Sequence, residues 1–423
     1  MGKNTLKASM ALGLGVIAAA QSGPAMAANL TAPFDIENTA VLPKGVRNPR
    51  FKNIMIPLET KFNDNGVVEP LGQPLNKRVT WNDIVEAQTT TEDKNLVAGS
   101  VSSMGMSGTD SPGSTTGQVN TAVDVKVPVL AMGVTDRLTL AVAVPVYHVD
   151  ISTATGFVKS DQGQAFVNDV CSSDPTKCND AKRKLDDAIN QKLTRLGYQP
   201  VQSRTVSNVG DIKFVGKYRL QFSDKHSIAF KPTITAPTGV APNADQAVDV
   251  PTGDGQWDVG ATVVEAYQLL PWLEVSANAT YTNQLPDRIE RRIPKSADDR
   301  LSSDRETLNR NLGDQYSVGW TLTFGDPHKG LSLATAYSFQ YMDRVTYQGS
   351  MFSKDRYSFL EQFDQPEQWV HSATVMATFA TIDWFKEGKF FYPFQAQVAY
   401  SRPFAGRNVA AADVLAAEIV LFF

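Results

Sequence analysis

The chain has 423 residues, a formal net charge of −4 and two cysteines. A slightly acidic balance argues against nucleic acid as a partner, because phosphate backbones are bound by basic surfaces. Beyond the N-terminus, no stretch approaches the roughly 18 consecutive apolar residues that indicate a transmembrane helix. A mean hydropathy of −0.22 leaves two classes open, a soluble β-rich protein and a membrane barrel whose apolar surface is carried by alternate residues.

The N-terminus has the pattern of a secretory signal peptide. Lys3 and Lys7 are followed by a run of apolar and small residues, and Ala25-Met26-Ala27 forms an A-x-A cleavage site. We therefore exclude residues 1–27 from the fold and expect an exported protein. Residues 28–45 show no alternation and are predicted to form an irregular segment.

The first segment with strand patterning, 46–58, is also the weakest. Its charged residues Arg50 and Lys52 share a face with three aliphatic residues, which blurs the alternation. The connection that follows, 61–116, contains apolar residues at helical spacing between 81 and 104. We therefore predict two short helices in this connection rather than strands.

From residue 118 to the C-terminus, apolar and polar residues alternate clearly in eleven further segments. We predict strands over 118–129, 138–147, 211–222, 228–235, 257–269, 273–282, 315–324, 331–341, 369–384, 390–401 and 415–423. In 257–269, Glu265 falls on the apolar face, and a β-bulge would restore the phase.

The C-terminal nonapeptide, Leu415 to Phe423, is apolar at every second position and carries Glu418 on its other face. A strand with one apolar face suits a wall between lipid and water, although the edge strand of a soluble sheet has the same pattern. The terminal Phe423 resembles the signal that the bacterial barrel assembly machinery reads, which makes that machinery an expected partner.

The lengths of the connections decide between a sandwich and a barrel. Turns near 135, 224, 270, 326 and 387 are short. The connections 61–116, 154–206, 238–255, 285–312 and 344–366 are long. Such asymmetry is typical of outer-membrane barrels, which have short periplasmic turns and long extracellular loops. Aromatic residues at the strand ends beside the short turns predict a periplasmic girdle: Phe222, Trp272, Phe324, Trp384 and Phe390.

We therefore predict an all-β protein, a transmembrane antiparallel β-barrel of about 12 strands in the bacterial outer membrane. Residues 46–423 would form this single barrel, with short helices in the extracellular loops and both termini on the periplasmic side. Residues 28–45 would lie at its periplasmic entrance or inside it. If 95–107 were also a strand, the number would rise to 14.

The two cysteines, Cys171 and Cys178, enclose a short segment of the 154–206 connection. In an exported protein this spacing predicts a local disulfide. A metal site would need more ligands than the sequence places nearby, so we expect no metal and no cofactor.

Assigning the apolar face of every strand to lipid puts nine charged residues in the lumen. They are Asp124, Lys126, Asp211, Lys213, Lys217, Arg219, Lys231, Glu274 and Glu418. These residues could form a structural network of ion pairs or line a selective path for a polar or amphipathic solute. Their near balance of charge argues against a strongly ion-selective porin. Glu418 is expected to face basic residues across the barrel.

Two further features could bear on function. Pro128, Pro145 and Pro232 interrupt three well-patterned strands, which indicates either tolerated bulges or a local opening. The 344–366 connection is rich in aromatic residues that could capture a hydrophobic ligand outside the cell or pack over the barrel mouth. Its candidate residues are Met351, Phe352, Tyr357, Phe359 and Phe363.

Three sequence elements resemble a known family. They are V-L-P-K-G at 41–45, V-P-V-L-A-M-G-V-T-D-R-L-T-L-A-V-A-V-P-V at 127–146, and the pair A-P-T-G (236–239) and P-T-G-D-G-Q-W-D (251–258). They are similar to outer-membrane barrels linked to the phenol meta-degradation pathway, whose general plan is that of long-chain fatty-acid transporters. The resemblance implies transport of aromatic or other hydrophobic compounds, and it supplies no catalytic residues.

The favoured function is therefore passive uptake of small hydrophobic or aromatic compounds through an outer-membrane channel, with membrane lipid and the solute as partners. The alternative is a structural or adhesive barrel that binds a partner through its loops. A barrel enzyme is the least favoured, because it needs a nucleophile and a base held together. The sequence offers no convincing Ser–His pair.

Overall fold

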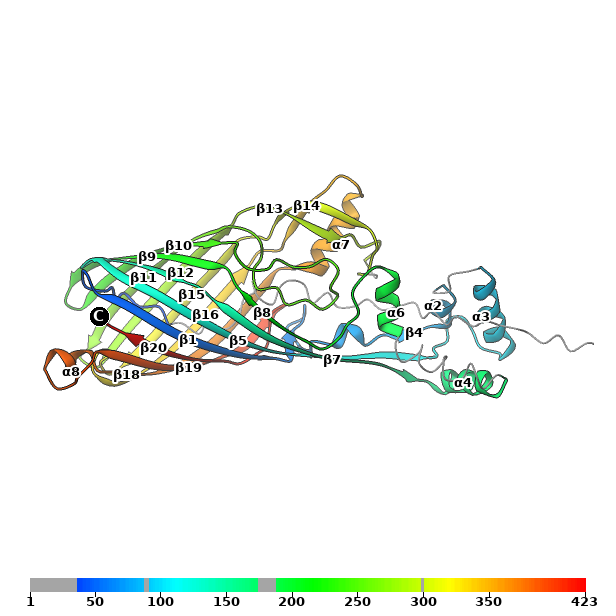
Figure 1. Ribbon diagram of the computed structural model, residues 1–423, viewed down its shortest axis with the longest axis horizontal. Coiled ribbons are helices and arrows are strands. Elements are labelled where there is room, and N and C mark those ends of the chain that lie inside the picture. The colour runs from blue at the N-terminus through cyan, green and yellow to red at the C-terminus, as the bar shows by residue number, and fades with distance from the viewer. Residues whose placement is uncertain (1–35, 87–90, 174–187, 298–299) are drawn as a thin grey trace, which may run out of the picture.

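The computed structural model describes residues 36–423 apart from 87–90, 174–187 and 298–299. The predicted signal peptide and Cys178 lie outside the described residues, so the cleavage site and the disulfide stay predictions. Figure 1 shows an elongated barrel with short turns at one end and helices projecting at the other.

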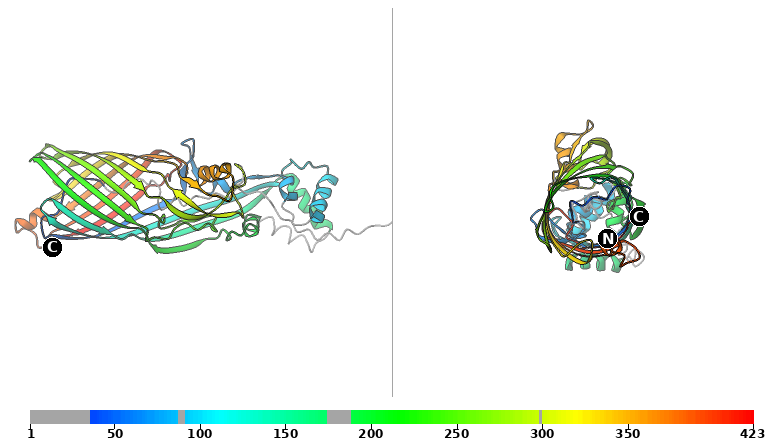
Figure 2. Two further views of the ribbon diagram at one scale, coloured as in Figure 1. Left: turned by 90° about the horizontal axis from the view of Figure 1, so that it is seen from above. Right: turned by 90° about the vertical axis from the view of Figure 1, so that its left-hand side faces the viewer.

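Most of the chain forms one closed antiparallel sheet. Its members are β1 (Arg47–Leu58), β5 (Gly113–Thr135), β6 (Leu138–Ala143), β7 (Val146–Lys159), β8 (Arg204–Val209), β9 (Ile212–Ser223), β10 (His226–Ala236), β11 (Asp258–Leu270), β12 (Leu273–Gln284), β15 (Gln315–Phe324), β16 (Gly330–Met342), β18 (Gln368–Ala380), β19 (Phe394–Arg407) and β20 (Val414–Leu421). β6 and β7 continue one another, as do β8 and β9. Counted this way, the described residues form twelve barrel strands, and the closed ring is seen end-on in Figure 2.

The barrel closes where the first strand meets the last. β1 pairs with β20 on one side and with β5 on the other, and Lys52 lies directly opposite Glu418. The weakly patterned segment 46–58 is therefore a barrel strand, and it closes the ring by pairing with the C-terminal strand. The 14-strand alternative is wrong, because most of 95–107 lies in helix α3 (Thr91–Ser103).

The remaining elements lie mostly in the long connections, as short helices and small sheets. The helices, besides α3, are η1 (Gln73–Leu75), α2 (Trp81–Glu86), α4 (Asp161–Ser173), α6 (Ala188–Arg195), α7 (Lys354–Asp364) and α8 (Ile382–Lys386). The small strands are β2 (Thr60–Phe62), β3 (Val68–Pro70), β4 (Arg78–Val79), β13 (Asp287–Arg292), β14 (Arg305–Asn311) and β17 (Thr346–Gln348). In the described part of the chain, no helix has the length and apolar character needed to cross a membrane.

Two strand predictions need correction. The strand predicted over 369–384 ends at Ala380, and the chain then turns through α8 before β19 begins. β11 has no bulge between Asp258 and Gln268. Glu265 therefore stays on the outer face, where its carboxylate lies 2.7 Å from Nε2 of His226. A partner at the strand end is what makes the charge tolerable there.

The outer surface of the barrel carries an apolar band with aromatic residues at both rims. Exposed aliphatic and aromatic side chains include Phe214, Phe230, Ile234, Val263, Leu322, Leu333, Val375, Val398 and Ile419. At the short-turn end the rings of Trp272 and Phe324 stack with centroids 6.4 Å apart. At the other end Tyr281 and Tyr316 are 5.4 Å apart. A closed barrel with such a surface resides in the bacterial outer membrane.

The sheet stays closed at the three prolines, although the strand pairing is interrupted on one side of each. β6 ends just before Val144, whose N–H donates to the carbonyl of Pro128 at 3.1 Å. The N–H of Gly210 donates to the carbonyl of Pro145 at 2.8 Å. Pro232 remains paired with Ala261 of β11, whereas the pairing of β10 with β9 skips from Phe230 to Thr233. The hydrogen bonds that remain favour the interpretation of these prolines as tolerated irregularities.

Candidate functional site

The orientation of β1 and β20 shows which face of each strand is the inside of the barrel. Glu418 is only 7% exposed, and its carboxylate lies 3.5 Å from Nζ of Lys52 and 3.9 Å from a guanidinium nitrogen of Arg50. Register places Lys52 opposite Val127 of β5 and Ile54 opposite Val125. Odd-numbered residues of β5 therefore face inward together with Glu418.

This register corrects two of the predicted lumen residues. Asp124 and Lys126 lie on the outer face of β5. Val125, which lies between them, and Val123, which precedes Asp124, are buried inside. On the neighbouring strand β7, the outward residues at the same level are His148 and Asp150. The outside of the barrel is therefore polar here, and the apolar side of the alternation points inward.

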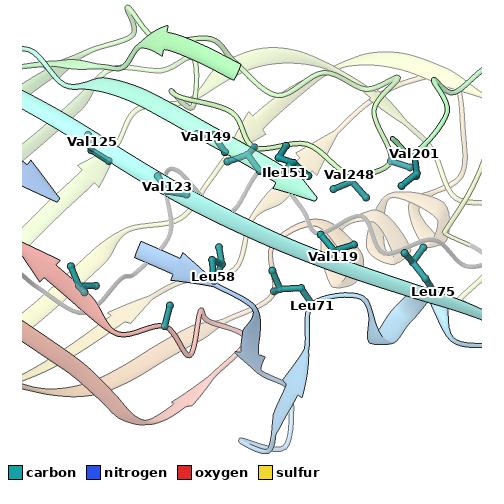
Figure 3. Close-up of a cluster of buried hydrophobic side chains, with 14 of the residues drawn as sticks. Leu58, Leu71, Leu75, Val119, Val123, Val125, Val149, Ile151, Val201 and Val248 are labelled. Atoms are coloured by element: carbon teal, nitrogen blue, oxygen red, sulfur yellow. The ribbon is translucent and has the colours of Figure 1, made fainter. Parts of the chain in front are cut away.

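The inside of the barrel near its outer mouth is filled by an apolar cluster, shown in Figure 3. Barrel residues Val119, Val123, Val125, Val149 and Ile151 pack there against residues of the long connections. These connection residues include Leu71, Leu75, Ile189, Leu193, Val201 and Val248. The cluster gives the mouth an apolar interior.

The other predicted lumen residues lie lower in the barrel or at its upper edge. Lys213, Lys217 and Arg219 occupy alternate positions of β9, opposite to the exposed Phe214, Tyr218 and Leu220. Lys231 of β10 and Glu274 of β12 also alternate with outward apolar residues. Asp211 lies in the short break between β8 and β9. There its carboxylate accepts the backbone N–H groups of Gly239 and Asp254 and anchors a loop.

Among the described residues, Arg50, Lys52 and Glu37 are charged residues of the lower lumen that sequence reasoning missed. Arg50 and Lys52 were set aside because they share a face with aliphatic residues, although that face as a whole is inward. Glu37 precedes the first strand, and its carboxylate forms an ion pair with Lys231. The only available signal was an acidic residue in an irregular segment predicted to lie at or inside the barrel.

The N-terminal segment, residues 36–46, runs inside the barrel at its short-turn end. Nζ of Lys217 donates to Oδ1 of Asn38 at 3.0 Å, and the hydroxyls of Thr39 and Ser227 are 2.7 Å apart. The backbone N–H of Leu42 donates to the hydroxyl of Thr139 at 2.8 Å. These contacts bind the segment to one side of the lumen, formed by β6, β9 and β10.

The opposite side of the lumen is polar and uncharged over much of its height. Small and hydroxyl side chains from β11 to β19 point inward there. They include Thr262, Ser276, Thr280, Thr321, Ser332, Thr374, Thr378 and Ser401. Hydroxyl groups pair across strands, with Thr262 and Thr280 2.9 Å apart and Thr374 and Ser401 2.8 Å apart. Charge is therefore concentrated on the β1, β9 and β10 side.

Above Lys213 the loop between β10 and β11 brings acidic groups together. Burial, with Asp211 and Asp287 nearby, raises the pKa of Asp254 to about 6. The guanidinium of Arg310 pairs with Asp287 at 2.7 Å, so part of this negative charge is compensated. The upper end of the lumen is therefore less basic than the region around Lys217.

The aromatic loop packs mostly on itself. Tyr357 is buried, and its hydroxyl donates to Glu306 at 2.6 Å. The guanidinium of Arg356 lies over the ring of Phe352, and that of Arg300 lies over the ring of Phe363. Phe359 is half-buried, whereas Met351 is 68% exposed. Of the predicted ligand-capture residues, Met351 is therefore the one that presents most of its side chain to solvent.

Together with the 285–312 connection, this loop forms a small external unit of β13, β14, β17 and α7 with its own core. Arg291 and Asp364 form a buried ion pair at 3.1 Å, and the hydroxyl of Tyr347 also donates to Asp364. Burial together with the Asp364 carboxylate raises the pKa of Tyr347. The tyrosine therefore remains a neutral donor in this unit.

Taken together, a closed barrel with an apolar outer band and a charged interior defines an outer-membrane β-barrel protein. No family model matches the chain, and no curated protein matches it. Among solved structures, the chain is similar to an outer membrane channel from Pseudomonas putida F1. The TM-score is 0.52 and the identity 15%, over 92% of this chain and 99% of that chain. This likeness shows the fold.

Two further structures are similar at lower scores. The CymD monoaromatic hydrocarbon channel has a TM-score of 0.33 and 8% identity, over 90% of this chain and 89% of that one. The Pseudomonas putida toluene transporter TodX has a TM-score of 0.31 and 9% identity, over 96% and 98% of the two chains. Scores this low carry no argument about the present chain.

Proposed function

We propose that the protein is an outer-membrane channel for the passive uptake of small hydrophobic or aromatic compounds. The observation that carries this proposal is the gradient along the inside of the barrel. An apolar cluster fills the outer mouth, and below it the lumen is lined by charged, hydroxyl and amide groups. A solute with an apolar body would enter at the apolar mouth and then pass along the polar lumen toward the short-turn end. Its path need not be apolar across the whole membrane.

Proteoliposomes test this function directly. A labelled neutral aromatic compound should enter vesicles that contain the protein faster than protein-free vesicles. Gln397 faces the lumen at the level of Glu418, so Gln397→Trp should obstruct the path and slow entry. Val398→Trp on the lipid-facing side is the matched control and should leave entry unchanged. Equal entry with and without protein would contradict the proposal.

Several narrower assignments belong to the same proposal. The resemblance at 41–45 and 127–146 supports membership of the phenol meta-pathway barrels. Phe423 is hydrogen-bonded through its backbone to Arg47, and its ring packs edge-on against Tyr392 while staying 67% exposed, which supports recognition by the assembly machinery. A disulfide between Cys171 and Cys178 and cleavage after Ala27 complete these assignments. Mass spectrometry of the purified, non-reduced protein tests the disulfide and the cleavage site.

Binding of a partner through the loops is the second candidate function. The external unit of β13, β14, β17 and α7 favours it, because a separate core and an exposed Met351 suit a contact surface. Deleting this unit would separate the two functions. Uptake should persist if the unit only binds a partner.

We propose no enzymatic role, although the structure contains one arrangement that sequence reasoning missed. Nδ1 of His148 lies 2.8 Å from the hydroxyl of Ser207, and its Nε2 lies 3.7 Å from Asp150. All three are on the outer face of β7 and β8, where His148 is 52% exposed. Hydrolysis also needs donors aimed at the developing oxyanion. Covalent labelling of Ser207 by a fluorophosphonate probe would overturn this assignment.

A further inference from the structure

Five basic side chains gather inside the barrel from β1, β9 and β10. They are Arg50, Lys52, Lys217, Arg219 and Lys231. Lys217 lies within electrostatic range of Arg50, Arg219, Lys231 and Glu37, so these groups form one cluster inside the barrel, although β5 and β6 separate β1 from β9 in the sheet. We call these five residues the lumen basic cluster.

The acidic groups that face the cluster do not balance it. In the described part of the chain, Glu418 lies near Lys52 and Arg50, Glu37 binds Lys231, and Glu274 is in electrostatic range of Arg219. Three carboxylates therefore face five cations. Arg50 and Lys52 add two cations to the lumen while Glu37 adds one carboxylate, so the charge balance expected from the sequence does not hold at this level.

Two of the cations are incompletely satisfied by protein groups. Nζ of Lys217 donates to the amide oxygen of Asn38, which is a neutral acceptor. Nε of Arg219 is buried and has no hydrogen-bond partner among the described residues. A buried cationic donor without an anionic acceptor favours binding of an anion from outside the chain.

Glu37 shows which kind of anion fits the cluster. Its carboxylate is the one acidic group here that comes from the irregular segment 36–46 rather than from a barrel strand. The neighbouring contacts of Asn38 and Thr39 hold that segment by neutral hydrogen bonds. A carboxylate on a solute could therefore replace Glu37 without breaking the barrel wall.

We propose that the lumen basic cluster binds the carboxylate of a small aromatic acid and that this group competes with Glu37 for Lys231 and Lys217. The inference rests on the proposed channel function and names its solute class. In this proposal the ring of such a molecule contacts the apolar residues of the mouth during entry, and the cluster below selects for the anionic group. The preferred solute is thus amphipathic and negatively charged rather than a neutral hydrocarbon.

Uptake of two matched probes into proteoliposomes tests the proposal. Benzoate is anionic at neutral pH, and benzamide is its neutral counterpart of similar shape. Benzoate should enter about tenfold faster, which is the effect of one charge-assisted hydrogen bond. The double variant Lys217→Gln/Lys231→Gln should abolish this preference. Glu37→Gln should increase benzoate entry, because it removes the internal competitor.

The controls separate a loss of the site from a loss of the fold. Lys126→Gln changes a basic residue on the outer face and should retain the preference. Lys231→Arg keeps the charge and should also retain the preference for benzoate, while a heat-dependent gel shift verifies that each variant is folded.

Equal entry of benzoate and benzamide into vesicles with the unaltered protein overturns the proposal and leaves the channel function intact. If neither probe enters faster than into protein-free vesicles, the channel function itself fails. Stronger inhibition of benzoate entry by inorganic phosphate than by acetate would overturn the assignment of a carboxylate.

Discussion

Strands β5 and β9 have the same kind of sequence pattern but opposite orientations. In β9 the basic residues Lys217 and Arg219 point into the lumen, and Phe214 and Leu220 point to lipid. In the upper half of β5 the charged residues point outward, and Val123 and Val125 point inward. Alternation gives the period of the side chains and leaves open which face is which.

The surroundings of each strand explain the difference. β9 crosses the lipid band, where an outward charge would be costly. The upper half of β5 continues beyond that band together with β7, so its outer face meets water. Its inner face meets the connections that fill the mouth, including Leu71 and Val248. A single barrel therefore has a polar interior at one level and an apolar interior at another.

The largest expected effect comes from charging the inner face of β5. Val125 is 5% exposed, and Val125→Asp would bury a carboxylate without a partner in the apolar cluster. We expect a loss of about 3–5 kcal/mol in the free energy of unfolding, measured by urea titration of the refolded protein. The neighbouring Lys126→Asp on the outer face should change it by less than about 0.5 kcal/mol. Similar losses for both variants would mean that the two faces of β5 are assigned wrongly.

A slightly smaller effect is expected when the outer face of β10 is charged. Phe230 is 48% exposed in the apolar band, and Phe230→Arg should cost about 2–4 kcal/mol in a phospholipid bilayer. Thr233→Arg points into the lumen and should cost less. Urea unfolding in bilayers of defined composition measures both. If Thr233→Arg is more destabilising than Phe230→Arg, the assignment of the outer face of β10 to lipid is wrong.

Much of the barrel could be predicted from the sequence because its signals are local. Alternation, the lengths of the connections and the positions of Phe222 and Trp272 beside short turns all follow from the membrane. These signals located twelve strands and the closing pair of β1 and β20. They could not reveal the sheet of β13, β14 and β17, whose short strands lie within connections and pair across long sequence separations.

The lumen was less predictable because its sides depend on contacts between distant segments. Arg50 and Ile54 share the inward face of β1, so that face is charged at one level and apolar at the next. The rule that apolar faces meet lipid fails where loops fold back into the mouth. Glu37 could not be placed from the sequence, because only the folded barrel brings it to Lys231.

The loop between β10 and β11 at the upper end of the lumen differs from the basic region around Lys217 in carrying acidic groups, and this difference predicts a pH effect. Burial raises the pKa of Asp254 to about 6 from an ordinary value of 3.8, so the folded protein binds the proton more tightly than the unfolded chain. The stabilisation by protonation is complete below about pH 4 and is lost as pH rises through about 6. Asp254→Asn should therefore stabilise the protein by about 2 kcal/mol at about pH 8 and have no such effect at about pH 4. Urea midpoints across this range measure the effect, and a constant difference would contradict it.

The smallest expected effect compares an ion pair of the lumen with one of the outer surface. Glu418 is buried beside Lys52, so Glu418→Gln leaves that cation with weaker compensation and should cost about 1–2 kcal/mol in the free energy of unfolding. Glu265 pairs with His226 on the outer face and is 58% exposed, so Glu265→Gln should cost about 0–1 kcal/mol. Both variants remove one negative charge and keep the side-chain shape, which makes each the control for the other. Added salt should reduce the effect at Glu265 more than at Glu418, because exposed charges are screened and buried ones are not. Equal costs with equal salt dependence would place Glu418 in contact with solvent and weaken the distinction between the two faces of the barrel.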